Sequence, residues 1–252
     1  MKILQFARNA AVCLLAGVSA MVPSLASAQG ATAATGMFTL DFTLAGRPTQ
    51  ADVFPAKGPM RGAVILTHGF MRKRWTFIGH GEALAGEGVL AVVPDLPYKM
   101  DSRDNARALR ELVAKLREGA IFKPVDRIVL VGFSAGGLAA LLAADAPGVV
   151  GYIGLDPFDR PGGIGLAAAR TLQTPVVLMR GPPSACNAFS IAEPWVGALP
   201  HLVEDRVLEG ANHCDFESPT DWVCRMICGE QDPGRHQIVR EGLIKAVRQW
   251  LP

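Results

Sequence analysis

One serine set between two glycines, in the stretch GFSAG at 132–136, most constrains how this chain can fold. An apolar run at 127–131 stands directly before it, and a helix-forming run at 138–144 stands directly after it. A strand, a sharp turn and a helix in that order lift the Ser134 hydroxyl above a sheet edge, at the N-terminus of the helix. A hydroxyl placed there can attack a carbonyl. We therefore predict that Ser134 is a nucleophile rather than a serine in an ordinary glycine-rich turn.

The first 28 residues differ in composition from the rest of the chain. Two basic residues, Lys2 and Arg8, precede an apolar stretch at 10–22, and small residues at 26–28 offer a cleavage site. This pattern predicts a secretory signal peptide over 1–28 and a periplasmic or extracellular protein. The alternative is an uncleaved anchor, but a membrane span needs about 20 apolar residues. We predict no stable membrane span in the mature chain.

The charges of the chain argue against a nucleic-acid partner. The formal net charge is +2, and the basic residues are scattered except for the triplet at 72–74. A surface that follows a phosphate backbone needs clustered basic residues. We therefore expect no nucleic-acid binding, and we interpret the triplet as a solvated loop.

Export determines how the cysteines are interpreted. Cys13 falls within the predicted signal peptide, and four cysteines follow it: Cys186, Cys214, Cys224 and Cys228. An even number in an exported chain predicts two disulfides, with three possible pairings. The alternative is a zinc site with these ligands: Cys214, Cys224, Cys228 and either His213 or His236. Only the pair four residues apart has the close spacing that zinc ligands prefer, so we predict disulfides, no metal and no cofactor.

Short apolar runs alternate with helical segments along the chain. Alternating apolar and polar residues at 37–44 and 50–54, around a turn at 45–47, predict an antiparallel hairpin. Nearly continuous apolar runs predict strands buried on both faces, at 63–67, 89–93, 127–131, 149–155 and 175–179, with a last strand at 203–208. Helices are predicted at 79–85, 102–118, 136–144, 163–172 and 236–250. The pattern predicts one α/β domain over 29–252, with a mostly parallel sheet, an N-terminal antiparallel hairpin and helices on both faces.

A histidine late in the chain is expected to activate Ser134. Ligands bind at the carboxyl ends of parallel strands, and after a serine turn of this kind the acid comes next in the chain and the histidine last. Of the five histidines, two precede the serine, one begins the last predicted strand and one falls near the final helix. Only His213 follows the last strand closely, so we predict that His213 is the general base.

The acid that orients His213 is expected one strand earlier than usual. The strand at 175–179 is followed by residues 180–184, which contain no carboxylate. The strand before it ends in Leu155 and is followed at once by Asp156, which we predict to be the acid. Asp159 stays open as the alternative, and Asp215 is a weaker one because it lies on the same loop as the histidine.

An oxyanion hole needs two backbone donors aimed at the tetrahedral intermediate. The amides of Ala135, directly after the serine, and of Phe70, in the loop after the first parallel strand, are the predicted donors. His68 is expected to brace that loop. Four more aromatic residues fall near the same sheet edge and are predicted to line an apolar acyl or alcohol pocket, with core packing as the alternative: Trp75, Phe133, Phe158 and Trp195.

These motifs together resemble the α/β-hydrolase superfamily, from about Phe38 to the end of the chain. The segments that carry the resemblance are His-Gly-Phe at 68–70, GFSAG at 132–136, Leu-Asp-Pro at 155–157 and Asn-His-Cys-Asp-Phe at 212–216. The position of the acid is similar to that in the chlorophyllase and platelet-activating-factor acetylhydrolase group. Dienelactone hydrolases and polyester hydrolases look more distant. Chlorophyllases commonly have histidine where this chain has Phe133, and dienelactone hydrolases have cysteine where it has Ser134.

The resemblance implies an α/β-hydrolase fold and ester hydrolysis. The expected protein is a secreted or periplasmic serine carboxylic-ester hydrolase, which acts through an acyl-enzyme on a small or lipid-like ester with an apolar group. Two alternatives remain at this point. The same triad could act on an amide or transfer the acyl group to an alcohol, or the fold could serve a binding protein without turnover.

Overall fold

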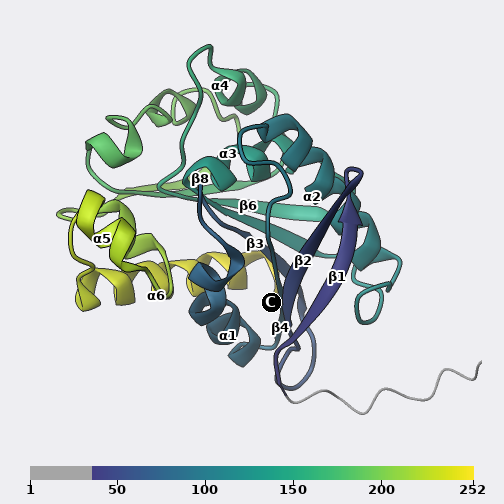
Figure 1. The fold of residues 1–252 in the computed structure, drawn as a ribbon. Coiled ribbons are helices and arrows are strands. Elements are labelled where there is room, and N and C mark those ends of the chain that lie inside the picture. Colours follow the sequence, from purple (N-terminus) through teal and green to yellow (C-terminus); the bar gives the residue numbers. More distant parts are fainter. Residues whose placement is uncertain (1–35) are drawn as a thin grey trace, which may run out of the picture. The chain divides into compact units, whose positions relative to one another are not determined.

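An eight-stranded sheet organises the part of the chain that this computed structural model describes, residues 36–252 (Figure 1). The predicted signal peptide, 1–28, lies outside the described residues. The strand order is β1-β2-β4-β3-β5-β6-β7-β8. The strands are β1 (Phe38–Leu44), β2 (Arg47–Phe54), β3 (Gly62–Thr67), β4 (Val89–Pro94), β5 (Ile128–Phe133), β6 (Val149–Leu155), β7 (Val176–Arg180) and β8 (Leu202–Val207).

The strands from β3 onward run parallel, and β1 and β2 form the predicted antiparallel hairpin. Ala45 and Gly46 form its two-residue turn with positive φ angles of 48° and 78°, which is the turn geometry that matches the twist of a hairpin. The second strand starts at Arg47 rather than at Gln50. The mostly parallel sheet with an antiparallel N-terminal edge is therefore confirmed.

Helices cover both faces of the sheet, as the alternation in the sequence predicts (Figure 1). One face packs against α2 (Ser102–Arg117), α3 (Ser134–Ala143) and α4 (Ile164–Ala169). The other packs against α1 (Ile78–Gly86) and α6 (Pro233–Trp250). Strands buried between two helical layers need apolar residues on both faces, which explains the continuous apolar runs.

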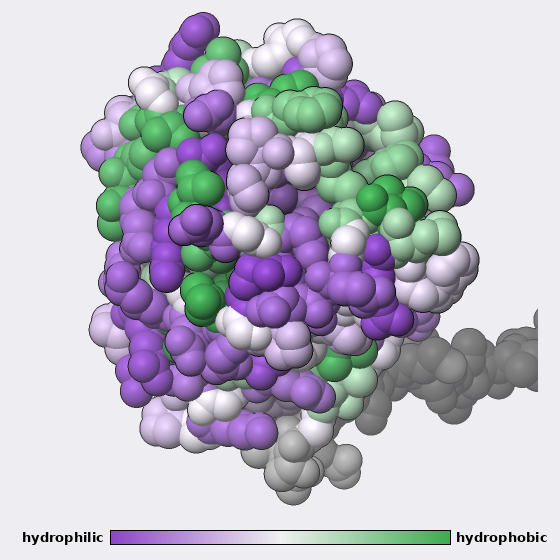
Figure 2. Space-filling model, turned by 90° about the vertical axis from the view of Figure 1, so that its left-hand side faces the viewer, coloured by the Kyte–Doolittle hydropathy of each residue, from purple (hydrophilic) through white to green (hydrophobic). Residues whose placement is uncertain are grey.

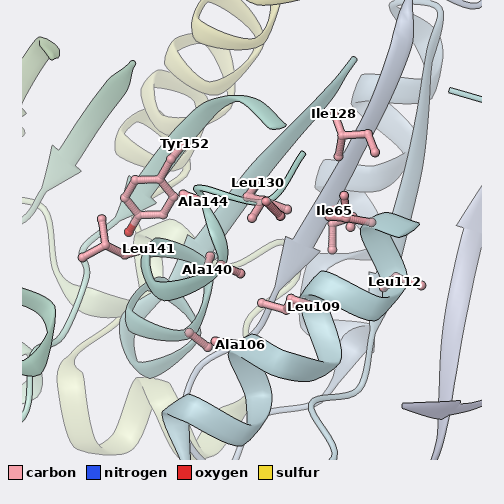
Figure 3. Packing of buried hydrophobic residues seen from close by; sticks show 14 of the residues in the cluster. Ile65, Ala106, Leu109, Leu112, Ile128, Leu130, Ala140, Leu141, Ala144 and Tyr152 are labelled. Atoms are coloured by element: carbon pink, nitrogen blue, oxygen red, sulfur yellow. The ribbon is translucent and has the colours of Figure 1, made fainter. Parts of the chain in front are cut away.

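The core between the sheet and α2 and α3 shows how the sequence builds one of these layers (Figure 3). Leu109 and Leu112 of α2 are buried against the sheet, where Ile65 and Leu130 meet them. Burial of one such side chain stabilises the fold by about 2 kcal/mol. The Tyr152 hydroxyl, the one polar group among the labelled side chains, donates to the backbone carbonyl of Gly137 at 3.0 Å. This layer fixes β5 and α3, the two elements that flank Ser134.

The helix α5 (Trp222–Cys228) has no counterpart in the sequence prediction. Its large apolar side chains are exposed, and its cysteines at 224 and 228 are bonded to other segments. A surface helix is usually recognised by an apolar stripe that faces the core, and α5 presents apolar residues outward. Among residues 36–252, no helix is both long and apolar enough to cross a membrane.

Candidate active site

Ser134 lies at the turn between β5 and α3, where the sequence places it. Its φ angle is 51°, in the left-handed region that residues with a side chain rarely adopt. The turn is tight because α3 approaches the end of β3 closely. A Cβ atom on Gly136 would lie 2.2 Å from the carbonyl oxygen of His68, so only glycine fits at this position. The strain at a serine directed to the sheet edge is typical of a functional position.

His213 and Asp156 meet in a short hydrogen bond at the same edge. The Nδ1 atom of His213 lies 2.6 Å from Oδ2 of Asp156, and both side chains are buried. Asp156 follows β6 directly and has a positive φ angle of 40°. The histidine starts a short 3-10 helix, His213–Phe216, after β8. A carboxylate at Nδ1 leaves Nε2 of the ring free to exchange a proton with a nucleophile.

Gly181, directly after β7, contacts both Asp156 and the segment that leads to His213. The segment between β8 and His213 must pass over β7 to reach Asp156, since β7 lies between β6 and β8. A Cβ atom on Gly181 would lie 3.1 Å from the carbonyl oxygen of Ala211 in that segment. The amide of Gly181 instead donates to Oδ1 of Asp156 at 2.9 Å. The position after β7 therefore supports Asp156 through its backbone and leaves little space for a side chain.

The two alternative acids have other partners. Asp159 accepts hydrogen bonds from the backbone amides of Gly165 and Leu166 at the start of α4, and from the indole of Trp195 at 2.8 Å. Asp215 accepts from the amide of Asp232 and from the side chain of Arg235, both at 2.7 Å. Both carboxylates are buried and their hydrogen bonds hold the backbone in place. The geometry thus favours Asp156 over Asp159 and Asp215.

Phe133 joins the serine turn to the histidine. Its ring centroid lies 4.4 Å from that of His213, at an interplanar angle of 38°. Since Phe133 directly precedes Ser134, His213 packs against the residue next to the serine in the chain. Between residues 36 and 252 no hydrogen bond links Ser134 to His213. In enzymes without bound substrate this contact is often long and tightens when substrate binds.

The loop after β3 reaches the serine turn. A Cβ atom on Gly69 would lie 3.1 Å from that of Ser134, so the loop that carries Phe70 packs against the serine turn. His68 braces the loop: its Nδ1 bonds the carbonyl oxygen of Gly69 and its Nε2 accepts from the amide of Leu96, both at 2.9 Å. Burial lowers the pKa of His68 to about 4. At neutral pH the ring is therefore uncharged, and its 3.7 Å contact with Asp95 is not an ion pair.

The basic triplet at 72–74 is not a solvated loop, and that prediction is wrong. Arg72 donates two hydrogen bonds to Glu217, at 2.6 and 2.7 Å, and a third to Asp221. Arg74 pairs with Asp52 and Asp95, and only the lysine between the two arginines is largely exposed. Ion pairs to distant carboxylates compensate for the burial of these guanidinium groups. The first of these pairs ties the loop after β3 to the segment that follows His213.

The chain can now be compared with known proteins. The profile of the alpha/beta hydrolase family matches residues 64–207, more than half of the chain. The chain belongs to this family. No curated protein matches the sequence of this α/β hydrolase.

Solved structures of three hydrolases share the fold. A dienelactone hydrolase from Anabaena variabilis is similar over 86% of this chain and 98% of its own, with a TM-score of 0.69 and 16% identity. The esterase domain of a Rhodothermus marinus protein covers 86% of this chain and 100% of its own, with a TM-score of 0.65 and 17% identity. An alpha-beta serine hydrolase homologue from Coxiella burnetii covers 82% of this chain and 96% of its own, with a TM-score of 0.63 and 17% identity. At these identities the likeness shows the α/β-hydrolase fold.

The structure does not bring all the predicted pocket residues of this α/β hydrolase to the site. Trp195 is fully buried beneath α4 and bonded to Asp159, so its place in the pocket is corrected to the core. Phe133 is also buried and faces the histidine ring. Trp75 is 40% exposed. Phe158 is half-buried and its amide donates to the carbonyl of Ser134 at 3.0 Å, which places it beside the serine turn. Figure 2 views the side that carries α5 and shows apolar side chains in separate patches among hydrophilic ones.

The four cysteines within residues 36–252 of this α/β hydrolase form two disulfides, Cys186–Cys228 and Cys214–Cys224. Both bonds end on α5. Sulfur atoms of Cys214, Cys224 and Cys228 lie within 4.8 Å of one another, which is the cluster that the zinc alternative invoked. Their closeness follows from the two adjacent disulfides, and a bonded cysteine offers no thiolate to zinc. The prediction of two disulfides is therefore confirmed in the structure.

Proposed function

We propose that this protein is an exported serine carboxylic-ester hydrolase, with a single catalytic domain over 29–252. The observation that carries the proposal is the 2.6 Å hydrogen bond between His213 and Asp156, beside a serine held in a strained turn at the same sheet edge. A serine, an imidazole and a buried carboxylate are the groups that acyl transfer requires, and they are recognised by geometry rather than by chain position. Membership of a hydrolase family supports the proposal.

The first half of the reaction forms an acyl-enzyme. The Ser134 oxygen attacks the ester carbonyl while Nε2 of His213 takes its proton. Asp156 stabilises the imidazolium through Nδ1. The amides of Ala135 and Phe70 donate to the oxyanion of the tetrahedral intermediate. When this intermediate collapses, the imidazolium gives its proton to the leaving alcohol and the acyl group stays on the serine.

The second half releases the acid. His213 removes a proton from water, the water oxygen attacks the acyl carbonyl, and the imidazolium returns the proton to Ser134 as the carboxylic acid leaves. The ester is proposed to carry an apolar group, small or lipid-like, because Phe70 is exposed in the loop that reaches the serine turn and the half-buried Phe158 donates its amide to the carbonyl of Ser134. The resemblance to the chlorophyllase group remains part of this proposal. Two disulfides and the predicted signal peptide support export.

Hydrolysis of chromogenic short-chain esters by purified residues 29–252 tests the proposal. We expect turnover that Ser134→Ala abolishes, and labelling of the wild type at Ser134 by a fluorophosphonate. Faster cleavage of a matched anilide would identify an amidase, and ester formation with an added alcohol in preference to hydrolysis would identify an acyltransferase. A folded protein with neither turnover nor labelling would contradict the proposal and leave a binding protein.

A further inference from the structure

We propose that Asn187 is a positioning residue that fixes the carboxylate of Asp156, and that the Cys186–Cys228 disulfide holds Asn187 in place. The inference deepens the proposed function, since it rests on Asp156 as the acid. The sequence analysis did not identify Asn187. Its role depends on contacts across a loop that has no regular pattern.

The side-chain amide of Asn187 has all its hydrogen-bonding positions filled. The residue is 1% exposed and ends the short 3-10 helix Ala185–Asn187 after β7. Its Nδ2 donates to Oδ1 of Asp156 at 3.2 Å and to the carbonyl of Pro182 at 2.9 Å. Its Oδ1 accepts from the amides of Ser184 at 2.8 Å and Ser190 at 3.0 Å. The two backbone donors fix which end is oxygen, so Nδ2 must face the carboxylate.

The contact with Asn187 completes the set of donors around Asp156. Oδ2 of the carboxylate faces His213, and Oδ1 accepts from Asn187 and from the backbone of Gly181. Within residues 36–252, Asn187 and His213 are the only side chains that hydrogen-bond to this carboxylate. Two donors on one oxygen prevent rotation of the carboxylate and direct the other oxygen at the base.

The backbone that presents Asn187 is strained. The next three residues, Ala188, Phe189 and Ser190, have φ angles of 49°, 56° and 60°, and the buried hydroxyl of Ser190 has no hydrogen-bond partner. Three consecutive left-handed residues with side chains persist only where the surroundings determine the conformation. The hydrogen bonds of Asn187 and the adjacent disulfide supply that constraint.

The segment next to the proposed acid and the segment next to the proposed base are both bonded to the helix α5. Cys186, directly before Asn187, is bonded to Cys228 of α5. Cys214, directly after His213, is bonded to Cys224 of the same helix. The two bonds therefore fix the position of the segment that carries Asn187 relative to the segment that carries His213. This explains why a seven-residue helix with exposed apolar side chains is kept in place by covalent bonds.

Asn187→Asp tests the proposal with little change in shape. The new side chain can still accept from Ser184 and Ser190, but it presents a carboxylate to Asp156 instead of a donor. We expect kcat/KM to fall by about tenfold to hundredfold, the range seen when hydrogen-bond partners of site residues are removed. Two carboxylates at this distance compete for one proton, so the pH profile of kcat/KM should also differ in shape from that of the wild type.

Asn105→Asp is the matched control. Asn105 is also buried, and among the described residues its side-chain amide bonds only the backbone of Tyr98. The substitution buries an equivalent carboxylate away from Asp156. Rates are expressed per active site, which is counted by titration with a fluorophosphonate, so that unfolded protein does not lower the measured rate. We expect the pH profile of this variant to match that of the wild type. Asn187→Ala, which adds no charge, replaces the aspartate variant if the latter does not fold.

The outcomes separate this inference from the proposed function. If Ser134→Ala is inactive but Asn187→Asp and Asn187→Ala keep the wild-type rate and pH profile per titrated site, Asn187 has a structural role only and the inference is wrong. If the wild type has no esterase activity, the proposed function fails. The inference is then decided by proton NMR of the hydrogen bond between His213 and Asp156. Its low-field resonance should shift in Asn187→Ala and stay unchanged in Asn105→Asp, and an unchanged signal in both would overturn the inference.

Discussion

The ring of Phe133 packs against the imidazole of His213, with the two centroids 4.4 Å apart. This contact connects the residue before the serine to the proposed base. The same base is hydrogen-bonded to Asp156, which lies 57 positions earlier in the chain. The serine turn, the acid and the histidine therefore come from three separate strand ends and converge at one place. Residues that act as a unit in this way give strongly non-additive effects when they are replaced.

Ser134→Ala and His213→Ala should each lower kcat by ~10⁴ to 10⁶, with folding nearly intact. The double variant should be little worse than either single variant, because removal of one member already disables the other. Steady-state kinetics with a soluble chromogenic ester measures this, and circular dichroism controls for folding. If Ser134→Ala retained most of the activity, the assignment of Ser134 as the nucleophile would be wrong.

Asp156→Asn and Asp159→Asn should have different consequences. The first keeps the shape of the acid but favours the wrong tautomer of the histidine, which cost ~10⁴ in kcat in a well-studied protease. The second weakens the contacts that hold the start of α4 and the indole of Trp195. We expect it to lower Tm with a far smaller effect on kcat. The reverse pattern would show that Asp159 is the acid.

Local patterns in the sequence were sufficient to predict the fold and three convergent residues. The strand, the glycine-flanked serine and the helix are adjacent in the chain, and Asp156 follows directly on an apolar run. The same holds for β3 to β7, which are nearly continuous apolar runs and largely buried. Such signals depend on neighbours along the chain.

The rest could not be predicted because it depends on contacts between distant segments. Arg72 meets Glu217 across 145 residues, so a cluster that looked solvated is paired. The bond between Cys186 and Cys228 joins residues 42 apart, and four cysteines alone allow three pairings. Trp195 is aromatic and lies near a loop, but only the position of Asp159 shows that it belongs to the core.

Replacement of Arg72 should separate stability from activity. Arg72→Met leaves the fully buried Glu217 without its partner, which typically costs about 3 to 5 kcal/mol. The double variant Arg72→Met/Glu217→Gln removes that uncompensated charge, so we expect Tm to recover in large part. Its kcat/KM should stay low, because the loop after β3 is no longer tied to the segment after His213. Arg127→Lys, at the opposite sheet edge, is the control for the loss of a guanidinium.

The protein should lose stability between pH 7 and pH 5. Burial lowers the pKa of His80 to about 3 and that of His68 to about 4. The unfolded chain binds protons to these histidines near their ordinary value of 6.5, whereas the folded protein does not, so stability rises with pH between about 4 and 6.5. Each histidine should contribute a loss of about 2 kcal/mol on acidification from pH 7 to pH 5.

His80→Gln tests this pH dependence. The glutamine amide can still donate to the carbonyl of Phe216, the present partner of the ring. Urea denaturation at pH 7 and pH 5 should show a smaller loss of stability on acidification than in the wild type. His201→Gln, at an exposed position, should leave the loss unchanged. An equal loss in His80→Gln and wild type would contradict the proposed origin of the acid sensitivity.

Reduction of the disulfides should reduce activity before the protein unfolds. Each bond typically stabilises a fold by about 2 to 4 kcal/mol, so reductant should lower Tm. Both bonds hold segments that carry or position the acid and the base, and local loosening of these segments costs less free energy than global unfolding. Activity and far-ultraviolet circular dichroism are measured over a series of reductant concentrations. Loss of activity only together with loss of the dichroism signal would show that the bonds are purely structural.

Protein isolated from an oxidising compartment and denatured without reductant should show no free thiols once Cys13 has left with the signal peptide, and peptide mapping should recover the pairs 186–228 and 214–224. Four free thiols would overturn the assignment of both bonds.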